Sequence, residues 1–177
     1  MPEHARFEEL VLPHLDAGHN LARWLTRDAS DAEDVVQDAC LRALKYVGAV
    51  HGGDARAWFL TVVRHAFYDW CRRNRPAELV DDEGAIEAAV DVGLQPEQAA
   101  LRNAESRALA EAVEQLPLVF REVLILREFE DLSYKEIARI ARIPVGTVMS
   151  RLARARSLLQ RSPLLQPIRS ETLRGQQ

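Results

Sequence analysis

The chain has 177 residues, which suits one large or two small domains, and its 47% hydrophobic content can fill buried cores. No stretch approaches the roughly 18 consecutive apolar residues of a membrane span, and the first residues lack a signal peptide. Two isolated cysteines and five histidines show no metal-ligand spacing. We therefore expect a cytoplasmic protein without membrane insertion, metal or other cofactor.

The formal charge of −4 is unevenly distributed. Seven acidic residues and no Lys or Arg lie in residues 76–100, and the rest of the chain carries a net charge of +3. Two prolines and two glycines also fall in this segment. Residues 76–100 are therefore predicted to form an acidic flexible linker, and the rest of the chain has room for basic surfaces.

Glycine and proline are scarce, and alternating apolar and polar residues are rare, so the predicted fold class is all-α. Apolar residues at helical spacing from Phe7 to Leu25 predict one or two amphipathic helices, which Pro13 and Gly18 could break or kink.

The next predicted helix runs from Asp31 to about Tyr46, with Ser30 and Glu33 as its capping box. Its expected buried stripe is Val36, Ala39 or Cys40, Ala43 and Val47. The opposite face presents Asp34, Gln37, Asp38 and Leu41. A leucine exposed among acids indicates a protein-binding surface, although a merely solvated acidic face has the same charges.

A glycine-containing segment from Val47 to Arg56 follows, without the GK[ST] ending of a phosphate-binding loop. The helix after it, "AWFLTVVRHAFYDWCRRNR", buries Phe59, Val63, Ala66 and Trp70 on one predicted stripe. Its other side carries Thr61 together with aromatic and basic residues: Arg64, His65, Tyr68, Arg72, Arg73 and Arg75. Rings interleaved with cations suit single-stranded DNA, although a basic helix end stabilised by its dipole is the alternative.

Two helices are predicted from Leu101 to Leu116 and from Pro117 to Phe129, followed by a helix pair after Leu132. Ser133 and Glu136 form a capping box, and Pro144 and Gly146 mark a turn. The last helix buries Val148, Leu152, Ala155 and Leu159 and turns Thr147, Ser150, Arg151 and Arg154 outward. This pattern favours a DNA-reading helix-turn-helix, since arginine pairs with guanine, over an ordinary helix pair with an arginine face.

The predicted architecture is thus two small helical domains, 1–75 and 101–162, joined by the linker and followed by a tail at 163–177. Three segments in this order resemble a bacterial RNA polymerase sigma factor of the extracytoplasmic-function group. They are "DAEDVVQDACLRAL", "AWFLTVVRHAFYDWCRRNR" and "LPLVFREVLILREFEDLSYKEIARIARIPVGTVMSRLARAR". The resemblance covers the chain from about Leu10 to Arg161.

The resemblance implies a non-enzymatic initiation factor that binds core RNA polymerase, reads promoter −10 and −35 elements and helps melt the DNA. It implies that Asp34, Gln37, Asp38 and Leu41 dock on the clamp helices of the largest subunit. The 47–56 loop would capture a flipped −10 base, next to Arg64, His65, Tyr68, Arg72 and Arg73. Thr147, Ser150, Arg151 and Arg154 would read the −35 element, in a domain that also rests on the polymerase flap. An anti-sigma partner is implied as well.

Two positions depart from the family pattern. His65 stands where asparagine is frequent, and Met149 stands where arginine is frequent. Met149 can offer an apolar contact to a thymine methyl group. A stand-alone helix-turn-helix regulator and a protein adaptor are the alternatives, and only the sigma factor gives both the acidic face and the basic helix a task. The residues offer no catalytic constellation.

Overall fold

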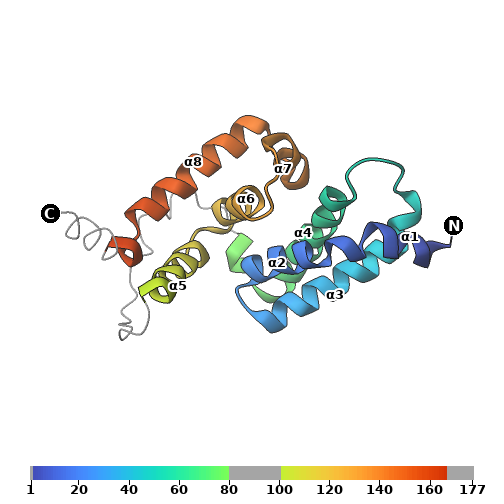
Figure 1. Cartoon of the computed structure of the whole chain (residues 1–177), viewed down its shortest axis with the longest axis horizontal. Coiled ribbons are helices and arrows are strands. Elements are labelled where there is room, and N and C mark those ends of the chain that lie inside the picture. Colours follow the sequence, from blue (N-terminus) through green and yellow to red (C-terminus); the bar gives the residue numbers. More distant parts are fainter. Residues whose placement is uncertain (1, 80–100, 167–177) are drawn as a thin grey trace.

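The computed structural model describes residues 2–79 and 101–166, and every regular element in these ranges is a helix. The all-α fold class is therefore confirmed. The first domain contains α1 (Glu3–Leu10), α2 (Leu15–Thr26), α3 (Ala29–Tyr46) and α4 (Ala55–Asn74) (Figure 1). The second contains α5 (Leu101–Glu114), α6 (Leu118–Glu128), α7 (Tyr134–Ala141) and α8 (Val145–Arg161). Four 3-10 turns accompany them: η1 (Leu12–His14), η2 (Val47–Ala49), η3 (Pro76–Leu79) and η5 (Pro163–Leu165).

Helices α2, α3 and α4 pack against one another around an apolar core. The predicted α4 stripe of Phe59, Val63, Ala66 and Trp70 is buried. Pro13 lies in η1, which separates α1 from α2, whereas Gly18 continues α2. A Cβ atom at Gly18 would lie 2.6 Å from Cε1 of Phe59, so the missing side chain lets α2 and α4 approach closely.

Helix α3 begins earlier than predicted. Asp28 is its N-cap, and the Asp28 side chain accepts a hydrogen bond from the Asp31 amide at 2.9 Å. The predicted capping box of Ser30 and Glu33 is therefore wrong, because the aspartate two residues upstream already satisfies the helix start. The buried stripe consists of Ala32, Val35, Ala39 and Ala43, so Val35 takes the place predicted for Val36.

The second domain contains the predicted helix-turn-helix. The Ser133–Glu136 capping box is present, and α7 is followed by its C-cap residue Arg142, whose backbone is left-handed with φ of 55°. Pro144 precedes α8, while Gly146 lies inside this helix rather than in the turn. Val148, Leu152 and Ala155 are buried as predicted, whereas Leu159 is only half-buried against the core. The helical period places Thr147, Ser150, Arg151 and Arg154 off this stripe.

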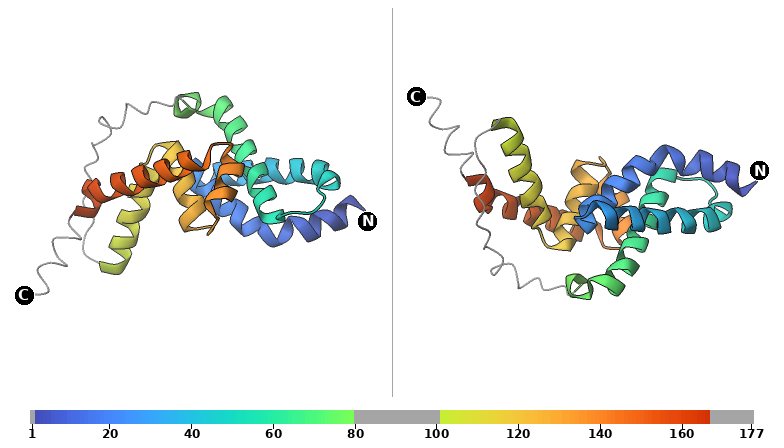
Figure 2. Two further views of the ribbon diagram at one scale, coloured as in Figure 1. Left: turned by 90° about the horizontal axis from the view of Figure 1, so that it is seen from above. Right: turned by 90° about the horizontal axis from the view of Figure 1, so that it is seen from below.

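The two domains lie side by side (Figure 2), with α6 against α2 and α7 against α4. The rings of Trp24 and Phe129 lie 5.2 Å apart across this junction. The domains therefore share an interface, which brings residues of α6 and α7 next to the first domain's α4.

The predicted linker and tail are described only in part. Residues 76–79 form η3 directly after α4, where Glu78 pairs with Arg27 at 2.5 Å and with Arg75 at 3.5 Å. Residues 163–165 form η5 next to α5. The remaining linker residues, 80–100, and the end of the tail, 167–177, lie outside the described residues, so the boundaries of both segments stay predictions.

Candidate functional site

The acidic face of α3 has the composition that was predicted for it. Asp34 and Gln37 are exposed, and Leu41 is 65% exposed, which is unusual for a leucine. Asp38 is half-buried, because Arg42 Nη2 lies 2.8 Å from its Oδ2 atom. The helical period places the four predicted residues on one side of α3. This face has the apolar centre and polar rim of a protein-binding surface.

The predicted DNA-binding face of α4 is partly covered by the second domain. The Arg64 side chain donates to Oε1 of Glu122 in α6, and the Tyr68 hydroxyl donates to Oε2 of the same carboxylate at 3.0 Å. The Arg64 guanidinium also lies 4.4 Å from the centroid of the Tyr68 ring. Glu122 is only 1% exposed. Burial and this neighbouring carboxylate raise the pKa of Tyr68, so its hydroxyl stays protonated and continues to donate.

The other predicted residues of this face are more open. Arg72 and Arg73 are exposed, and Arg72 Nη1 donates to Oδ1 of Asp69 at 2.5 Å. His65 is half-buried, and its pKa is lowered by burial and then by the nearby charges of Arg142 and Arg64. The face predicted as one unit is therefore divided into a covered part, Arg64 with Tyr68, and an accessible part.

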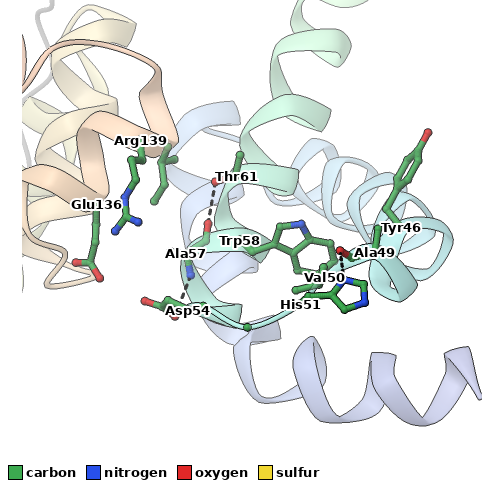
Figure 3. A pocket seen from close by; sticks show the side chains of 13 residues that line it. Tyr46, Ala49, Val50, His51, Asp54, Ala57, Trp58, Thr61, Glu136 and Arg139 are labelled. Atoms are coloured by element: carbon green, nitrogen blue, oxygen red, sulfur yellow. Dashed lines mark hydrogen bonds between the residues drawn. The ribbon is translucent and has the colours of Figure 1, made fainter. Parts of the chain in front are cut away.

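A cleft of about 440 Å³ lies where the 47–56 loop meets α4 and α7 (Figure 3). Tyr46, His51 and Trp58 supply aromatic rings on the first-domain side, and Glu136 and Arg139 lie on the α7 side. The loop is held at both ends: the His51 ring nitrogen lies 2.8 Å from the Ala49 carbonyl oxygen, and the Asp54 carboxylate caps α4. Gly52 and Gly53 have φ of +71° and +91°, where side chains are strained. Aromatic rings gathered in one cleft suit a planar ligand.

The outward face of α8 is accessible. Ser150 and Arg154 are exposed, and Thr147 and Arg151 are partly exposed. The Ser150 hydroxyl donates to the Thr147 carbonyl at 3.1 Å, which leaves its oxygen free to accept. Met149 is 54% exposed beside them. These side chains form the polar and basic surface that a recognition helix presents to the major groove.

The sequence did not reveal the residues that hold the domains together. Arg56 Nη2 donates to Glu130 at both its carbonyl oxygen, 2.6 Å away, and its Oε2 atom, 2.7 Å away. Arg121 is buried and donates to the Leu25 carbonyl at 3.1 Å. Burial, followed by the nearby charge of Arg27, lowers the pKa of Arg121 to about 10. The available signal was the pair Arg121–Glu122 inside an apolar run, because buried charges require partners.

Within residues 2–79 and 101–166, no three side chains of the metal-binding types gather at one place. None of the helices that the structure describes has both the length and the apolar character needed to cross a membrane.

Comparisons with known proteins place each domain in a family. Residues 10–77 match the model described as Sigma-70 region 2, and residues 106–159 match Sigma-70, region 4. The chain is 34% identical to the RNA polymerase sigma-H factor of Pseudomonas aeruginosa, over 93% of this chain and 89% of that protein. It is 38% identical to the ECF RNA polymerase sigma factor EcfG of Rhodopseudomonas palustris, over 76% of this chain and 72% of that protein.

Solved structures show the same arrangement of helices. The sigma factor RpoE of Bartonella quintana, in complex with the anti-sigma factor NepR, aligns with a TM-score of 0.69 and 29% identity. That alignment covers 90% of this chain and 96% of the other. CnrH, in complex with the cytosolic domain of CnrY, aligns with a TM-score of 0.61 and 25% identity, over 87% of this chain and 84% of the other.

Proposed function

The chain belongs to the extracytoplasmic-function group of bacterial RNA polymerase sigma factors, and on this premise we propose how its surfaces divide the work of initiation. As a sigma factor, it binds core RNA polymerase, recognises the −10 and −35 promoter elements and promotes melting of the DNA. Three surfaces of the two domains are available for these tasks.

The α3 face binds core polymerase in this proposal, through Asp34, Gln37, Asp38 and Leu41 on the clamp helices of the largest subunit. The exposure of Leu41 supports it, because an apolar side chain beside Asp34 and Asp38 gains from burial against a partner with basic groups. This face remains exposed while the second domain is docked, so polymerase can reach it without a prior rearrangement.

The α4 surface binds the −10 element through Arg64, His65, Tyr68, Arg72 and Arg73, and the cleft at the 47–56 loop receives a flipped base. Extruding a base costs a few kcal/mol, and stacking on the rings of the cleft offsets part of that cost. Glu122 holds Arg64 and Tyr68 in the present arrangement, so α6 must move before these two side chains meet DNA.

The α8 surface reads the −35 element through Thr147, Ser150, Arg151 and Arg154. The observation that carries this assignment is the helix-turn-helix geometry, in which a capped α7 and a tight turn leave these residues on the outward side of α8. Arginine forks and hydroxyl groups match base edges and phosphates of the major groove. Met149 adds an apolar group beside them.

Further partners follow from the family. The second domain rests on the polymerase flap, and an anti-sigma factor binds the chain, as the anti-sigma factor NepR binds RpoE of Bartonella quintana. The chain acts in the cytoplasm with RNA polymerase and forms or breaks no covalent bond itself, since its task is to position polymerase and DNA.

Two double variants test this division. Arg151→Ala with Arg154→Ala should reduce −35-dependent transcription by about tenfold or more, because each good base contact contributes about 1–3 kcal/mol, and should leave core affinity unchanged. Asp34→Ala with Gln37→Ala should weaken core binding instead. Both are measured with purified core polymerase, by binding titration and by transcription in vitro.

The assignment is contradicted if both pairs lower core affinity equally. The sigma function itself is contradicted if the wild-type chain binds core polymerase but directs initiation at no promoter, which would favour a stand-alone regulator.

A further inference from the structure

Four charged side chains of alternating sign form a chain across the first domain. Asp38 and Arg42 belong to α3, and Asp69 and Arg72 belong to α4. Arg42 Nη2 lies 2.8 Å from Asp38 Oδ2, and Arg42 Nη1 lies 2.6 Å from Asp69 Oδ2. Arg72 Nη1 then lies 2.5 Å from Asp69 Oδ1. The chain therefore connects the proposed polymerase-binding face with the proposed −10 face.

Each of the two central groups uses one atom for each neighbour. Arg42 offers one Nη atom to Asp38 and the other to Asp69, and the Asp69 oxygens divide between Arg42 and Arg72 in the same way. The hydrogen bond from Arg42, opposed by partial burial, lowers the pKa of Asp69. Asp69 is therefore ionised across the neutral pH range, and the chain of charges persists there.

A second ion pair joins α3 to Arg75, the C-cap residue of α4, and serves as a comparison. Arg75 Nη2 lies 2.8 Å from Asp31 Oδ2, with similar exposure of both side chains. Arg75 lies on the basic side of this segment, but neither Arg75 nor Asp31 is assigned above to polymerase or −10 DNA, and neither side chain has an ion pair or hydrogen bond to the residues that are. If the Arg42–Asp69 pair only held α3 and α4 together, loss of either ion pair would change polymerase and DNA binding to the same extent.

We propose that Arg42 and Asp69 are positioning residues, with Asp69 orienting Arg72 toward the −10 DNA and Arg42 orienting Asp38 toward polymerase. The proposal rests on the function proposed above for Arg72 and Asp38. Arg72 is 62% exposed, and its bond to Asp69 uses one N–H of the guanidinium fork, so the remaining N–H groups can meet a phosphate or a base.

Orientation matters because arginine has many rotamers. A free arginine loses that freedom when it binds DNA, whereas an arginine already held by Asp69 has less to lose. Loss of Asp69 should therefore weaken −10 binding by about twofold to tenfold, through a single immobilised side chain. If Asp69 instead competed with DNA for Arg72, removal of Asp69 would strengthen DNA binding.

The test measures the affinity of holoenzyme for a promoter fragment with a pre-melted −10 region, chosen by selection with the wild-type holoenzyme. Asp69→Ala is measured alone and together with Arg72→Ala, with Asp31→Ala as the matched control. We expect weaker binding from Asp69→Ala in the wild-type chain, no further loss in the Arg72→Ala chain, and near-wild-type affinity for Asp31→Ala. A merely structural role would reduce binding in both backgrounds.

Four results overturn the positioning role of Asp69. One is equal loss from Asp69→Ala and Asp31→Ala, and another is tighter DNA binding after Asp69→Ala. The third is an Arg72→Ala variant that binds DNA as well as wild type, which overturns the proposed −10 role of Arg72 as well. An Asp69→Ala variant without effect, beside an Arg72→Ala variant that binds weakly, removes the positioning role alone.

A second double-mutant comparison, with affinity for core polymerase as the measurement, tests Arg42. Arg42→Gln should lower core affinity in the wild-type chain and have no further effect when Asp38→Ala is present, because its influence acts through that carboxylate. Asp31→Ala again serves as the control for loosened helices. Equal losses from Arg42→Gln in both backgrounds, or no loss in either, would overturn this half of the proposal.

Discussion

The α4 and α8 surfaces carry similar side chains in different surroundings. Both present arginines with neighbouring hydroxyl groups at helical spacing. On α4, Arg64 and Tyr68 contact a carboxylate of the other domain that is itself buried. On α8, Ser150 and Arg154 are exposed, and no carboxylate among the described residues pairs with Arg151 or Arg154. The α4 surface is therefore partly covered by the other domain, whereas the arginines of the α8 surface are not paired in this way.

This difference has a physical consequence for promoter binding. A carboxylate makes the same charge-assisted hydrogen bonds with arginine that a DNA phosphate makes, so in the division proposed above Glu122 takes the place of DNA at Arg64. The α8 surface requires no such displacement. Under the proposed division, the −35 element can therefore be bound with the domains closed, whereas contact of Arg64 and Tyr68 with the −10 element requires that α6 leave α4.

Removal of Glu122 should change the accessibility of the α4 surface, relative to the α8 surface, more than any other substitution considered below. Glu122→Ala leaves the poorly exposed Arg64 without its partner, and breaking a buried ion pair from one side costs about 3–5 kcal/mol. We expect the domains to separate and the free chain to bind single-stranded −10 DNA more tightly. Small-angle scattering and fluorescence anisotropy measure the two effects.

Glu128→Ala is the matched control for that variant. Glu128 also belongs to α6, but it is exposed and pairs with Arg156 of the same domain at 2.9 Å. It should change neither the dimensions of the chain nor its DNA affinity. If Glu122→Ala also leaves the dimensions unchanged, Glu122 does not hold the domains closed.

A substitution at Gly18 should affect one surface and spare the other. Gly18→Ala places a Cβ atom against Phe59, and overpacking of this kind costs about 1–3 kcal/mol. The melting temperature of the first domain, which carries the α4 surface, should decrease. The affinity of α8 for a −35 DNA fragment should stay within about twofold of wild type. Calorimetry and a −35 binding assay check this. A loss of −35 affinity together with the lower melting temperature would show that the domains unfold as one unit.

The smallest expected effect concerns pH. Burial, reinforced by Arg142 and Arg64, lowers the pKa of His65 in the folded chain below its unfolded value of about 6.5. The fold disfavours the charged imidazole, so stability decreases as pH falls through this range, because the unfolded chain binds the proton more readily. His65→Gln should flatten the change in melting temperature between about pH 7.5 and pH 5.5; an unchanged slope would remove His65 as a cause.

The local features of the fold were predictable. The Ser133–Glu136 box and the buried stripes of α4 and α8 depend on residues a few positions apart, so their spacing in the sequence is sufficient. The start of α3 was misplaced because Asp28 and Ser30 are both good N-caps, and the choice depends on packing of the helix that follows.

The covered part of α4 could not be predicted. Arg64 and Glu122 are 58 positions apart in the chain, and no local rule couples them. Sequence periodicity placed Arg64, Tyr68 and Arg72 on one face and could not distinguish the two side chains under α6 from the one outside it. The roles of the predicted site residues therefore stay predictions that require function to be measured.

Promoter selection in vitro is the most direct test that the α4 and α8 surfaces recognise two separate promoter elements. Core polymerase with the wild-type chain should enrich DNA carrying two separate sequence blocks upstream of the start site. Arg151→Ala should relax only the upstream block, and Arg72→Ala should weaken only the downstream block. If no block is enriched, or if both variants alter the same block, the α4 and α8 surfaces do not recognise separate promoter elements.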